Sequence, residues 1–364
     1  MNIDDIRRRI RSLRPIEGAD LRALCLSGLD LTRAVFMRSD LRGQSFERCT
    51  LDSTTFLDCD LRGSRFVGNG LARVTCSNCA MGGVAFDGVV LHECNFVDSA
   101  FEQATLTDVE LSRCMVTRCN LNRAQWSRVS GASCAFLEST LEGSKLDTVE
   151  LSSFCLNAID FTKLDFRGLS FDRGLLLACG FVRCDLTSCR FTATTLDQSD
   201  FRRADLRGMQ LVGCGFQESR FEDADLRGCV ADQALFTGAT LDRARFDGAS
   251  LMASQLCKVS AEEASFKGAR LEKSQWSEAR LIRCDLSGAA LRYSDFSHAQ
   301  LVDCNLEDAD VRSANFHEMV DDGVRWRNAA RRFSSGSDPQ RTKAETTQWG
   351  PRRGANGSKE EAKC

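Results

Sequence analysis

Cysteine is the residue type in this chain that most readily does chemistry, and 19 of the 364 residues are cysteines. The stretch "CGFVRCDLTSC" (179–189) places three of them at intervals of five residues, and "CSNC" (76–79) is a C-x-x-C pair. Thiolates at such spacings bind zinc or exchange disulfides. However, no second pair completes a zinc set, and the interval of five recurs along the chain. We therefore predict that these cysteines form no metal site.

Other catalytic arrangements are equally hard to find. The three histidines, His92, His298 and His317, are scattered, and no Ser, Cys or Asp stands near one of them in a recognisable arrangement. Paired carboxylates such as Asp223 and Asp225 recur only because a repeat recurs. The glycines do not form a phosphate-binding loop followed by a helix. The sequence therefore predicts no enzymatic activity, no catalytic residues and no cofactor.

A bulky residue every fifth position is the dominant pattern of the chain. Between Leu21 and Phe316 this spacing gives 60 sites without a phase slip, of which 30 are Leu and 21 are Phe. Of all phenylalanines, only Phe154 and Phe333 fall elsewhere. Five residues of α-helix advance about 500°, which spreads the bulky groups around the helix. On a flat strand an odd step sends every second one to the opposite face. The chain must therefore turn between one bulky residue and the next.

A second inward position lies two residues before each bulky site. Small residues such as Ala204 occupy it, and cysteine there replaces Ala or Ser as a small buried group. By contrast, Cys25, Cys155, Cys257 and Cys364 fall on outward or tail positions, where we expect the more reactive thiols. The fourteen cysteines at the inward position are Cys49, Cys59, Cys79, Cys94, Cys114, Cys119, Cys134, Cys179, Cys184, Cys189, Cys214, Cys229, Cys284 and Cys304.

The repeat unit reads "ADLRG" at 204–208 and again at 224–228. It resembles the pentapeptide-repeat family, whose unit is written A(D/N)LXX, and the resemblance covers most of the chain. This resemblance implies an all-β fold, a right-handed quadrilateral β-solenoid with four pentapeptides per coil and about 15 coils. The bulky residue and the small one before it would stack inside a rod about 70 Å long.

The N-terminus departs from the repeat. Ile3, Ile6, Ile10 and Leu13 recur at helical spacing, with acidic residues early and arginines later, as the helix dipole prefers. Because a solenoid needs its open end covered, we predict an N-terminal capping helix over residues 1–15.

The C-terminus departs from it as well. The solenoid is expected over 16–316, followed at 317–333 by a cap with a short helix that places Trp326 and Phe333 on the last coil. Residues 334–364 are rich in Ser, Gly, Lys and Arg with few apolar groups, and we predict a disordered tail there.

One coil breaks the size rule. Phe154, Ile159, Leu164 and Leu169 fill the small position on all four walls, while bulky residues keep the large one. Two bulky layers overfill a square cross-section. We expect the coil at 154–173 either to widen or to bulge and tilt the rod.

One outer wall carries apolar side chains. Just after the bulky site, large apolar residues recur at Met37, Leu57, Val97, Leu137 and Leu177, which multiples of 20 residues separate. A four-sided coil puts them on one wall, where the position before the bulky residue is also apolar or small over the middle coils. An ordinary surface with scattered apolar groups is the alternative. The candidate partner interface consists of Met115, Ala135, Leu137, Cys155, Leu175 and Leu177.

Function must come from the outer surface, and an interaction scaffold is the favoured hypothesis. Such a scaffold or adaptor, non-enzymatic and bacterial, needs only a rigid rod with a distinctive patch for a protein partner or a second copy of itself. Pentapeptide-repeat proteins also occur as effectors and accessory proteins of bacterial secretion systems, so a link to secretion is one form of this hypothesis.

Two alternatives involve nucleic acid. The best-understood members of the family are dimeric rods that mimic DNA on DNA gyrase and confer quinolone resistance, but mimicry requires dense negative charge. Here 51 acidic residues are balanced by 48 basic ones, which disfavours the mimic. The second alternative is a direct nucleic-acid interface along one basic edge. Acidic residues interrupt that edge and the aromatic residues are expected inside the rod, so this alternative is disfavoured too. The basic residues along one edge are Arg123, Lys163, Arg183, Arg203, Arg243 and Arg283.

Two features of the sequence indicate the compartment in which the protein acts. No apolar run approaches the ~20 residues of a membrane span, and the N-terminus lacks the core of a signal peptide. We therefore expect no membrane span and a cytoplasmic protein, with a secreted effector as the alternative.

Overall fold

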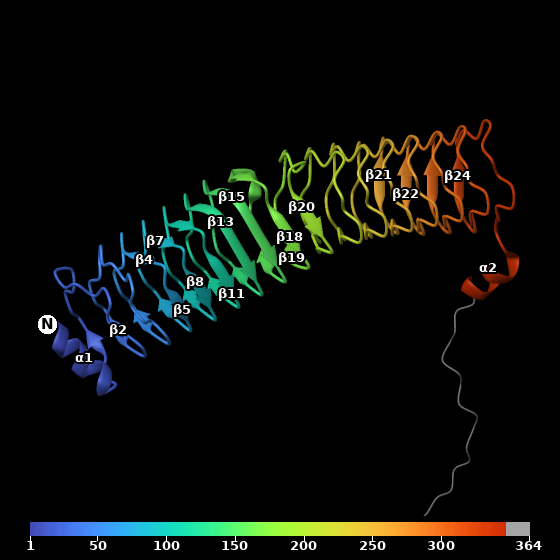
Figure 1. Ribbon diagram of the computed structural model, residues 1–364. Coiled ribbons are helices and arrows are strands. Elements are labelled where there is room, and N and C mark those ends of the chain that lie inside the picture. Colours follow the sequence, from blue (N-terminus) through green and yellow to red (C-terminus); the bar gives the residue numbers. More distant parts are fainter. Residues whose placement is uncertain (347–364) are drawn as a thin grey trace, which may run out of the picture.

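The chain winds into an elongated four-sided rod, shown in Figure 1, and the computed structural model describes residues 1–346. Each coil takes 20 residues, so parallel pairing joins positions 20 apart. We number the walls 1 to 4 by the bulky residues of the coil that begins at Phe201, namely Phe201, Leu206, Leu211 and Phe216. This is the expected quadrilateral β-solenoid.

Wall 4 of the N-terminal part forms a sheet of nine parallel strands. Phe36 pairs with Phe56 and every further strand continues the same register. In spatial order the strands are β1 (Ile16–Glu17), β2 (Val35–Met37), β3 (Thr55–Leu57), β6 (Thr75–Ser77), β9 (Asn95–Val97), β12 (Met115–Thr117), β14 (Ala135–Leu137), β16 (Cys155–Asn157) and β19 (Leu175–Leu177).

Walls 2 and 3 share a second sheet of eleven strands, because β13 and β15 run around the corner between them. On wall 2 lie β4 (Arg65–Val67), β7 (Ala85–Asp87), β10 (Thr105–Thr107) and β17 (Asp165–Arg167), and on wall 3 lie β5 (Gly70–Ala72), β8 (Val90–His92), β11 (Glu110–Ser112), β18 (Ser170–Asp172) and β20 (Arg190–Thr192). The two corner strands are β13 (Gln125–Ala132) and β15 (Lys145–Ser152).

The C-terminal part has fewer regular strands. Most of its walls are held by isolated parallel bridges, such as Asp205 with Asp225. Wall 1 alone forms a sheet there, from β21 (Ser260–Glu262), β22 (Arg280–Ile282), β23 (Gln300–Val302) and β24 (Val320–Asp322).

The interior is built from stacked side chains. The Phe201 ring lies between Phe181 and Phe221, each 4.9 Å away between centroids with planes 7° apart. The chain turns at the second residue after each bulky site, where Arg203 (φ 59°) and Gly208 (φ 67°) have left-handed backbone conformations. Glycine adopts this conformation freely, whereas other residues do so at a cost of about 1–2 kcal/mol.

The small inward position has a polar role that composition alone does not reveal. Its side chain donates to the carbonyl oxygen of the bulky residue 23 positions earlier, as Ser64 Oγ does to Leu41 at 2.8 Å and Cys94 Sγ to Leu71 at 3.2 Å. Since Cys, Ser and Thr all donate at this position, they can replace Ala without leaving a buried polar group unsatisfied. All fourteen cysteines expected here are buried except Cys189, which is half-buried.

Helix α1 (Ile3–Arg11) lies at the N-terminal end of the rod. Asn2 and Asp5 form a reciprocal capping box at its start, with the Asp5 amide donating to Asn2 Oδ1 at 2.9 Å. Ile6 is fully buried against the first coil, and the helix ends before Leu13, which is exposed. Leu13 therefore does not belong to the apolar face on which its spacing placed it.

Residues 317–333 differ from our expectation, because they form one more coil rather than a short helix. β24 pairs with β23, and Asp310 and Ala330 form a bridge on wall 3. The backbone ladder continues although Asp321 and Arg331 stand where bulky residues belong. These inward positions are exposed because no further coil covers them, which explains their polarity.

Two aromatic residues of this final coil are placed differently. Trp326 packs against the core, as expected, whereas Phe333 lies at a corner and is exposed. Within the predicted disordered tail, helix α2 (Pro339–Thr346) forms, and residues 347–364 lie outside the described part of the chain.

Candidate functional site

The six residues of the candidate interface lie together on wall 4. Met115, Ala135, Cys155 and Leu175 pair in sequence across β12, β14, β16 and β19, and Leu177 follows in the last of these strands. With Leu137 they cover four consecutive coils, and we call this set the apolar strip. Met115 and Leu175 are 45% and 42% exposed, and the other four are half-buried.

Charged side chains flank the apolar strip on both edges, with Arg113 and Arg173 at the corner before it and Asp98, Arg118 and Glu138 at the corner after it. The second of these edges is the more densely charged. There the Arg118 guanidinium binds Asp98 through Nε at 2.7 Å, one coil apart. This hydrogen bond lowers the pKa of the Asp98 carboxyl. The charges of Asp98 and Arg118 at this edge of the strip therefore cancel each other.

The ladders are interrupted on two walls, on wall 2 at the overfilled coil and on wall 3 one coil later. On wall 2 Asp165 does not pair with Asp185, and on wall 3 β20 does not pair with the coil that follows it. Walls 4 and 1 stay closed, through the Leu175–Thr195 and Gly180–Asp200 bridges. Two open walls and two closed walls tilt the rod, and Figure 1 shows it bending beyond β15.

Phe154 shows how the extra volume is partly absorbed. A Cβ atom at Gly174, in the same position one coil later, would lie 2.1 Å from the Phe154 ring. The missing side chain of Gly174 therefore makes room for the ring. Leu164 and Phe166 find no such space and remain half-buried at the opening.

The opening is a cleft of about 1190 Å³ on walls 1 and 2. Phe161, Leu164 and Phe166 line its apolar part, and charged residues of both signs surround them. Among these, Glu222 accepts from Arg220 through Oε1 at 3.0 Å, while its other oxygen is buried without a partner among the described residues. The cleft therefore offers an apolar surface beside one free acceptor.

The basic edge runs past this cleft and is neutralised there. Asp223 lies between Arg203 and Arg243, with a contact of 2.6 Å to Arg243 Nε and 3.7 Å to Arg203 Nε. The two guanidiniums lower the pKa of Asp223. Arg183 lies on the cleft and makes no ion pair with a described residue.

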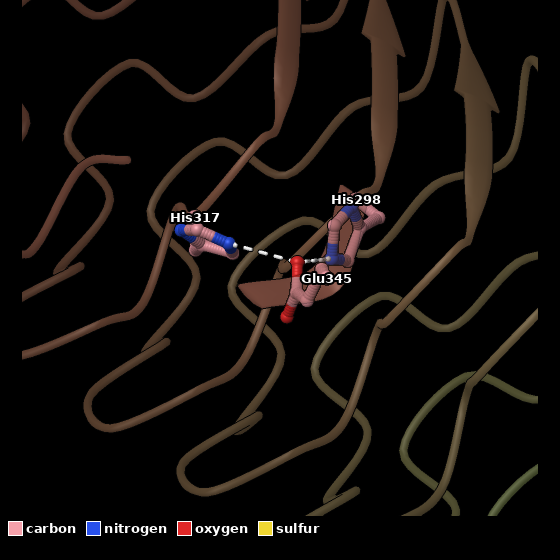
Figure 2. Close-up of side chains that lie close together, drawn as sticks. All are labelled: His298, His317 and Glu345. Atoms are coloured by element: carbon pink, nitrogen blue, oxygen red, sulfur yellow. Dashed lines mark hydrogen bonds and ion pairs between the residues drawn. The ribbon is translucent and has the colours of Figure 1, made fainter. Parts of the chain in front are cut away.

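Two of the histidines that are scattered in the sequence meet in space. Figure 2 shows His298 and His317 on either side of Glu345, with both Nε2 atoms 3.2 Å from the same carboxylate oxygen. His298 is the second and His317 the first residue after a bulky residue of wall 4 in consecutive coils, and the His298 amide donates to the His317 carbonyl at 2.8 Å. The register of the repeat therefore could have placed them side by side, 19 residues apart. Glu345 comes from α2, beyond the repeat, where no such count applies.

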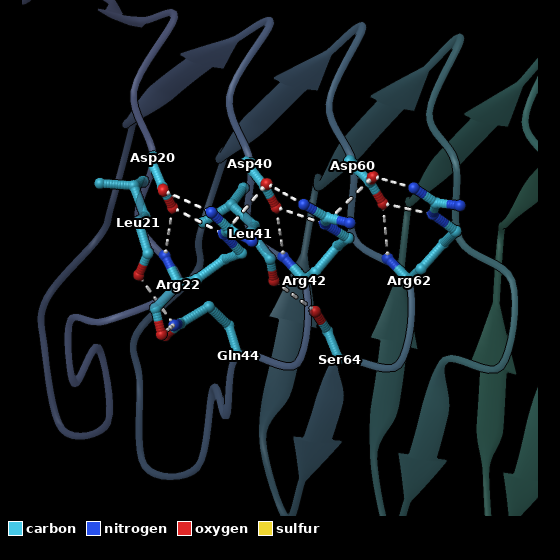
Figure 3. A network of polar contacts seen from close by, with 10 residues as sticks. All are labelled: Asp20, Leu21, Arg22, Asp40, Leu41, Arg42, Gln44, Asp60, Arg62 and Ser64. Atoms are coloured by element: carbon cyan, nitrogen blue, oxygen red, sulfur yellow. Dashed lines mark hydrogen bonds and ion pairs between the residues drawn. The ribbon is translucent and has the colours of Figure 1, made fainter.

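Acidic residues before the bulky sites are matched by arginines along wall 1. In Figure 3 Arg22 binds Asp20 through Nε at 2.9 Å and lies 3.2 Å from Asp40 of the next coil. Arg42 and Asp60 continue the ladder. Arg22, Arg42 and Arg62 lower the pKa values of Asp20, Asp40 and Asp60 respectively, each through hydrogen bonds to the carboxylate two residues earlier. The acids on this wall therefore form neutral pairs rather than a negative surface.

The thiols in the described residues are all free. Burial raises the pKa of Cys179 and of Cys229 to about 12, which keeps both protonated and unreactive. Of the outward cysteines, Cys25 is exposed, and Cys155 and Cys257 are half-buried. Cys364 lies outside the described residues.

Comparison with protein families gives two related matches. The family described as "Pentapeptide repeat region" matches residues 156–228. The family described as "Pentapeptide repeats (8 copies)" matches residues 17–51, 71–108, 219–256, 262–297 and 279–317. The matches together span more than half of the chain. No curated protein matches it.

Several solved structures are similar at low identity. HetL, a pentapeptide repeat protein involved in heterocyst differentiation regulation in the cyanobacterium Nostoc sp., is 21% identical over 61% of this chain and 87% of its own, with a TM-score of 0.32. QnrB1, a plasmid-mediated fluoroquinolone resistance protein, is 19% identical over 55% of this chain and 95% of its own, with a TM-score of 0.28. At these values neither structure carries an argument about function.

Among residues 1–346 no helix is both long enough and apolar enough to cross a membrane.

Proposed function

Since the chain belongs to the pentapeptide repeat family, we propose that it is a non-enzymatic scaffold that binds a protein partner through the apolar strip of wall 4. The observation that carries this proposal is the unbroken register of β12, β14, β16 and β19, which brings the six apolar or small side chains into one patch. Contiguous apolar patches mark interaction sites more often than scattered residues do. A second copy of the chain is one such partner, because a flat wall can be self-complementary.

The charge pattern supports a scaffold over a DNA mimic. A mimic of DNA must present a dense row of negative charge. On wall 1 each of Asp20, Asp40 and Asp60 is neutralised by an arginine two residues later. The same pairing recurs at Asp205 and Asp225 in the C-terminal part.

The ion pairs along the basic edge favour a scaffold over a nucleic-acid-binding protein. A groove that follows a phosphate backbone needs unpaired Lys and Arg side chains and aromatic rings for stacking. Arg203 and Arg243 instead contact Asp223, and Lys163 contacts Glu142 at 3.2 Å. The phenylalanines at bulky sites lie inside the rod.

The thiols support a cytoplasmic site of action. Free cysteines in such number persist in reducing compartments, whereas oxidising ones favour disulfides. A role in secretion remains the alternative, and cell fractionation followed by immunoblotting distinguishes the two.

Charge placed in the apolar strip tests the proposal. Leu137→Lys with Leu177→Lys puts two ammonium groups into it, and both positions face outward, so the fold and melting temperature should change little. We expect the oligomeric mass by light scattering to fall, or the native partner no longer to be captured from a host lysate and identified by mass spectrometry.

A matched control uses the same repeat position and spacing on the opposite wall. Val67→Lys with Thr107→Lys lies on wall 2 and should keep both the oligomeric mass and every captured protein. If the wall 4 variant keeps them too, the apolar strip is ordinary surface.

A supercoiling assay separates the scaffold from the mimic. Purified protein at high molar excess should leave DNA gyrase unaffected, and inhibition or protection of gyrase would favour the mimic instead.

A further inference from the structure

Three side chains from separate segments converge at the C-terminal end of the rod. His298 lies at a corner of wall 4, His317 lies in the next coil, and Glu345 lies near the end of α2 (Figure 2). Their ligand atoms all lie within 4.8 Å of one another. The His317 side chain is 2% exposed, whereas those of His298 and Glu345 are 40% and 36% exposed, so solvent reaches the group from one side.

The chemistry of this group matches that of a zinc-type ligand set. Imidazole nitrogen binds Zn²⁺ at about 2.0–2.1 Å and carboxylate oxygen at about 2.0–2.2 Å, which separates tetrahedral ligand atoms by about 3.3 Å. Each Nε2 atom already lies 3.2 Å from Glu345 Oε2. An approach of the two rings to that separation would complete a three-ligand site with water at the fourth position.

The carboxylate of Glu345 is oriented so that one of its oxygen atoms can bind a cation. Arg341, one turn earlier in α2, binds Oε1 at 2.7 Å and leaves Oε2 to the histidines. This hydrogen bond fixes the carboxylate so that Oε2 faces both imidazole rings. Nitrogen ligands favour Zn²⁺ and its late-transition neighbours over Mg²⁺ and Ca²⁺.

From this geometry we propose that His298, His317 and Glu345 bind one zinc-class divalent cation, which fastens α2 to the last coils. Without the cation the same residues hold α2 by hydrogen bonds alone. Thr342 Oγ1 of α2 adds a bond of 2.7 Å to Glu318 in either state.

Binding of the cation to His317 requires the segment before α2 to rearrange. The Asp338 amide donates to its Nδ1 at 3.0 Å, so the neutral ring carries its proton on Nε2 and directs it at Glu345. A cation at Nε2 requires that proton to move to Nδ1, where it would face the Asp338 amide hydrogen. The segment before α2 must therefore shift when the cation binds, and this shift lowers the affinity below that of a preformed site.

Calorimetric titration of the untagged full-length chain with ZnCl₂ is the direct test. Accessible thiols are first alkylated with iodoacetamide, because cysteines also bind zinc. We expect one equivalent to bind, and His298→Ala and Glu345→Gln each to weaken binding at least tenfold. MgCl₂ should give no binding.

The third histidine provides a matched control. His92 also lies beside a glutamate, with Nε2 3.6 Å from Glu93, but far along the rod from this group. His92→Ala should bind zinc as the unaltered chain does. Absence of binding, or binding that survives His298→Ala, overturns the proposal and leaves the three residues as a hydrogen-bonded contact without a metal.

Limited trypsin digestion tests the fastening of α2. Zinc should slow cleavage after Arg341 in the unaltered chain and in His92→Ala, but not in His298→Ala. Zinc bound at full stoichiometry with no slowing would overturn the claim that the cation holds α2.

Discussion

The coils at 154–173 and 224–243 follow the same five-residue rule and differ mainly in the small inward position. In the second coil that position holds Ala224, Cys229, Ala234 and Ala239, and the ladders to the next coil close on all four walls. In the first, bulky residues fill it, the ladder to the next coil is lost on wall 2, and the ladder on wall 3 is lost one coil later. The comparison indicates that side-chain volume inside the coil, rather than backbone propensity, decides whether the solenoid stays straight.

The largest expected effect contrasts one phenylalanine from each region. Phe221 is fully buried in a continuous ring stack, so Phe221→Ala should cost about 3–5 kcal/mol of unfolding free energy. Phe166 is half-buried at the cleft, so Phe166→Ala should cost less than half as much. Urea unfolding followed by circular dichroism measures both. Equal losses would mean that the cleft is closed in solution.

A smaller effect is expected where the overfilled coil packs against the coil that follows it. Gly174→Ala would place a Cβ atom 2.1 Å from the Phe154 ring and should cost about 1–3 kcal/mol through overpacking. In the Phe154→Ala background the same change should cost far less, as a double-mutant cycle would reveal.

Gly82→Ala is the control for this cycle. A Cβ atom there would approach no atom closer than 3.7 Å, so the free energy of unfolding should hardly change. A cycle with no coupling between Phe154 and Gly174 would show that the ring lies elsewhere.

The smallest expected effect leaves stability unchanged and compares two thiols. Cys189 is half-buried beside the open wall 3, whereas Cys229 is buried in a closed coil. Burial raises the pKa of both, to about 11 and about 12, so both react slowly at neutral pH. Mass spectrometry after treatment with a maleimide should find Cys189 labelled before Cys229. The reverse order would contradict an opening at this wall.

Much of this architecture was predictable because the rule is local. The wall assignment of Leu137 and Leu177 followed from counting by 20, and the inward thiols followed from counting by five. The C-terminal coil was not predictable, because Asp321 and Arg331 break the side-chain rule while the backbone ladder of the preceding coil still directs pairing. The pairing of His298 with His317 was missed although their register allowed it.

By itself, the sequence determined which positions face inward and outward, because a bulky group every fifth residue can be buried only in a chain that turns. Its resemblance to the pentapeptide-repeat family implied the four-sided solenoid, and with it the wall that carries the apolar strip. Only the tertiary structure decided which walls open at the overfilled coil and where Glu345 lies. Wall 4 stays closed because Gly174 leaves room for the Phe154 ring 20 residues earlier, whereas Leu164 and Phe166 find no such room at the opening. The place of Glu345 depends on where α2 docks beyond the repeat. Both are contacts between distant residues whose outcome depends on shape, which a periodic pattern does not encode.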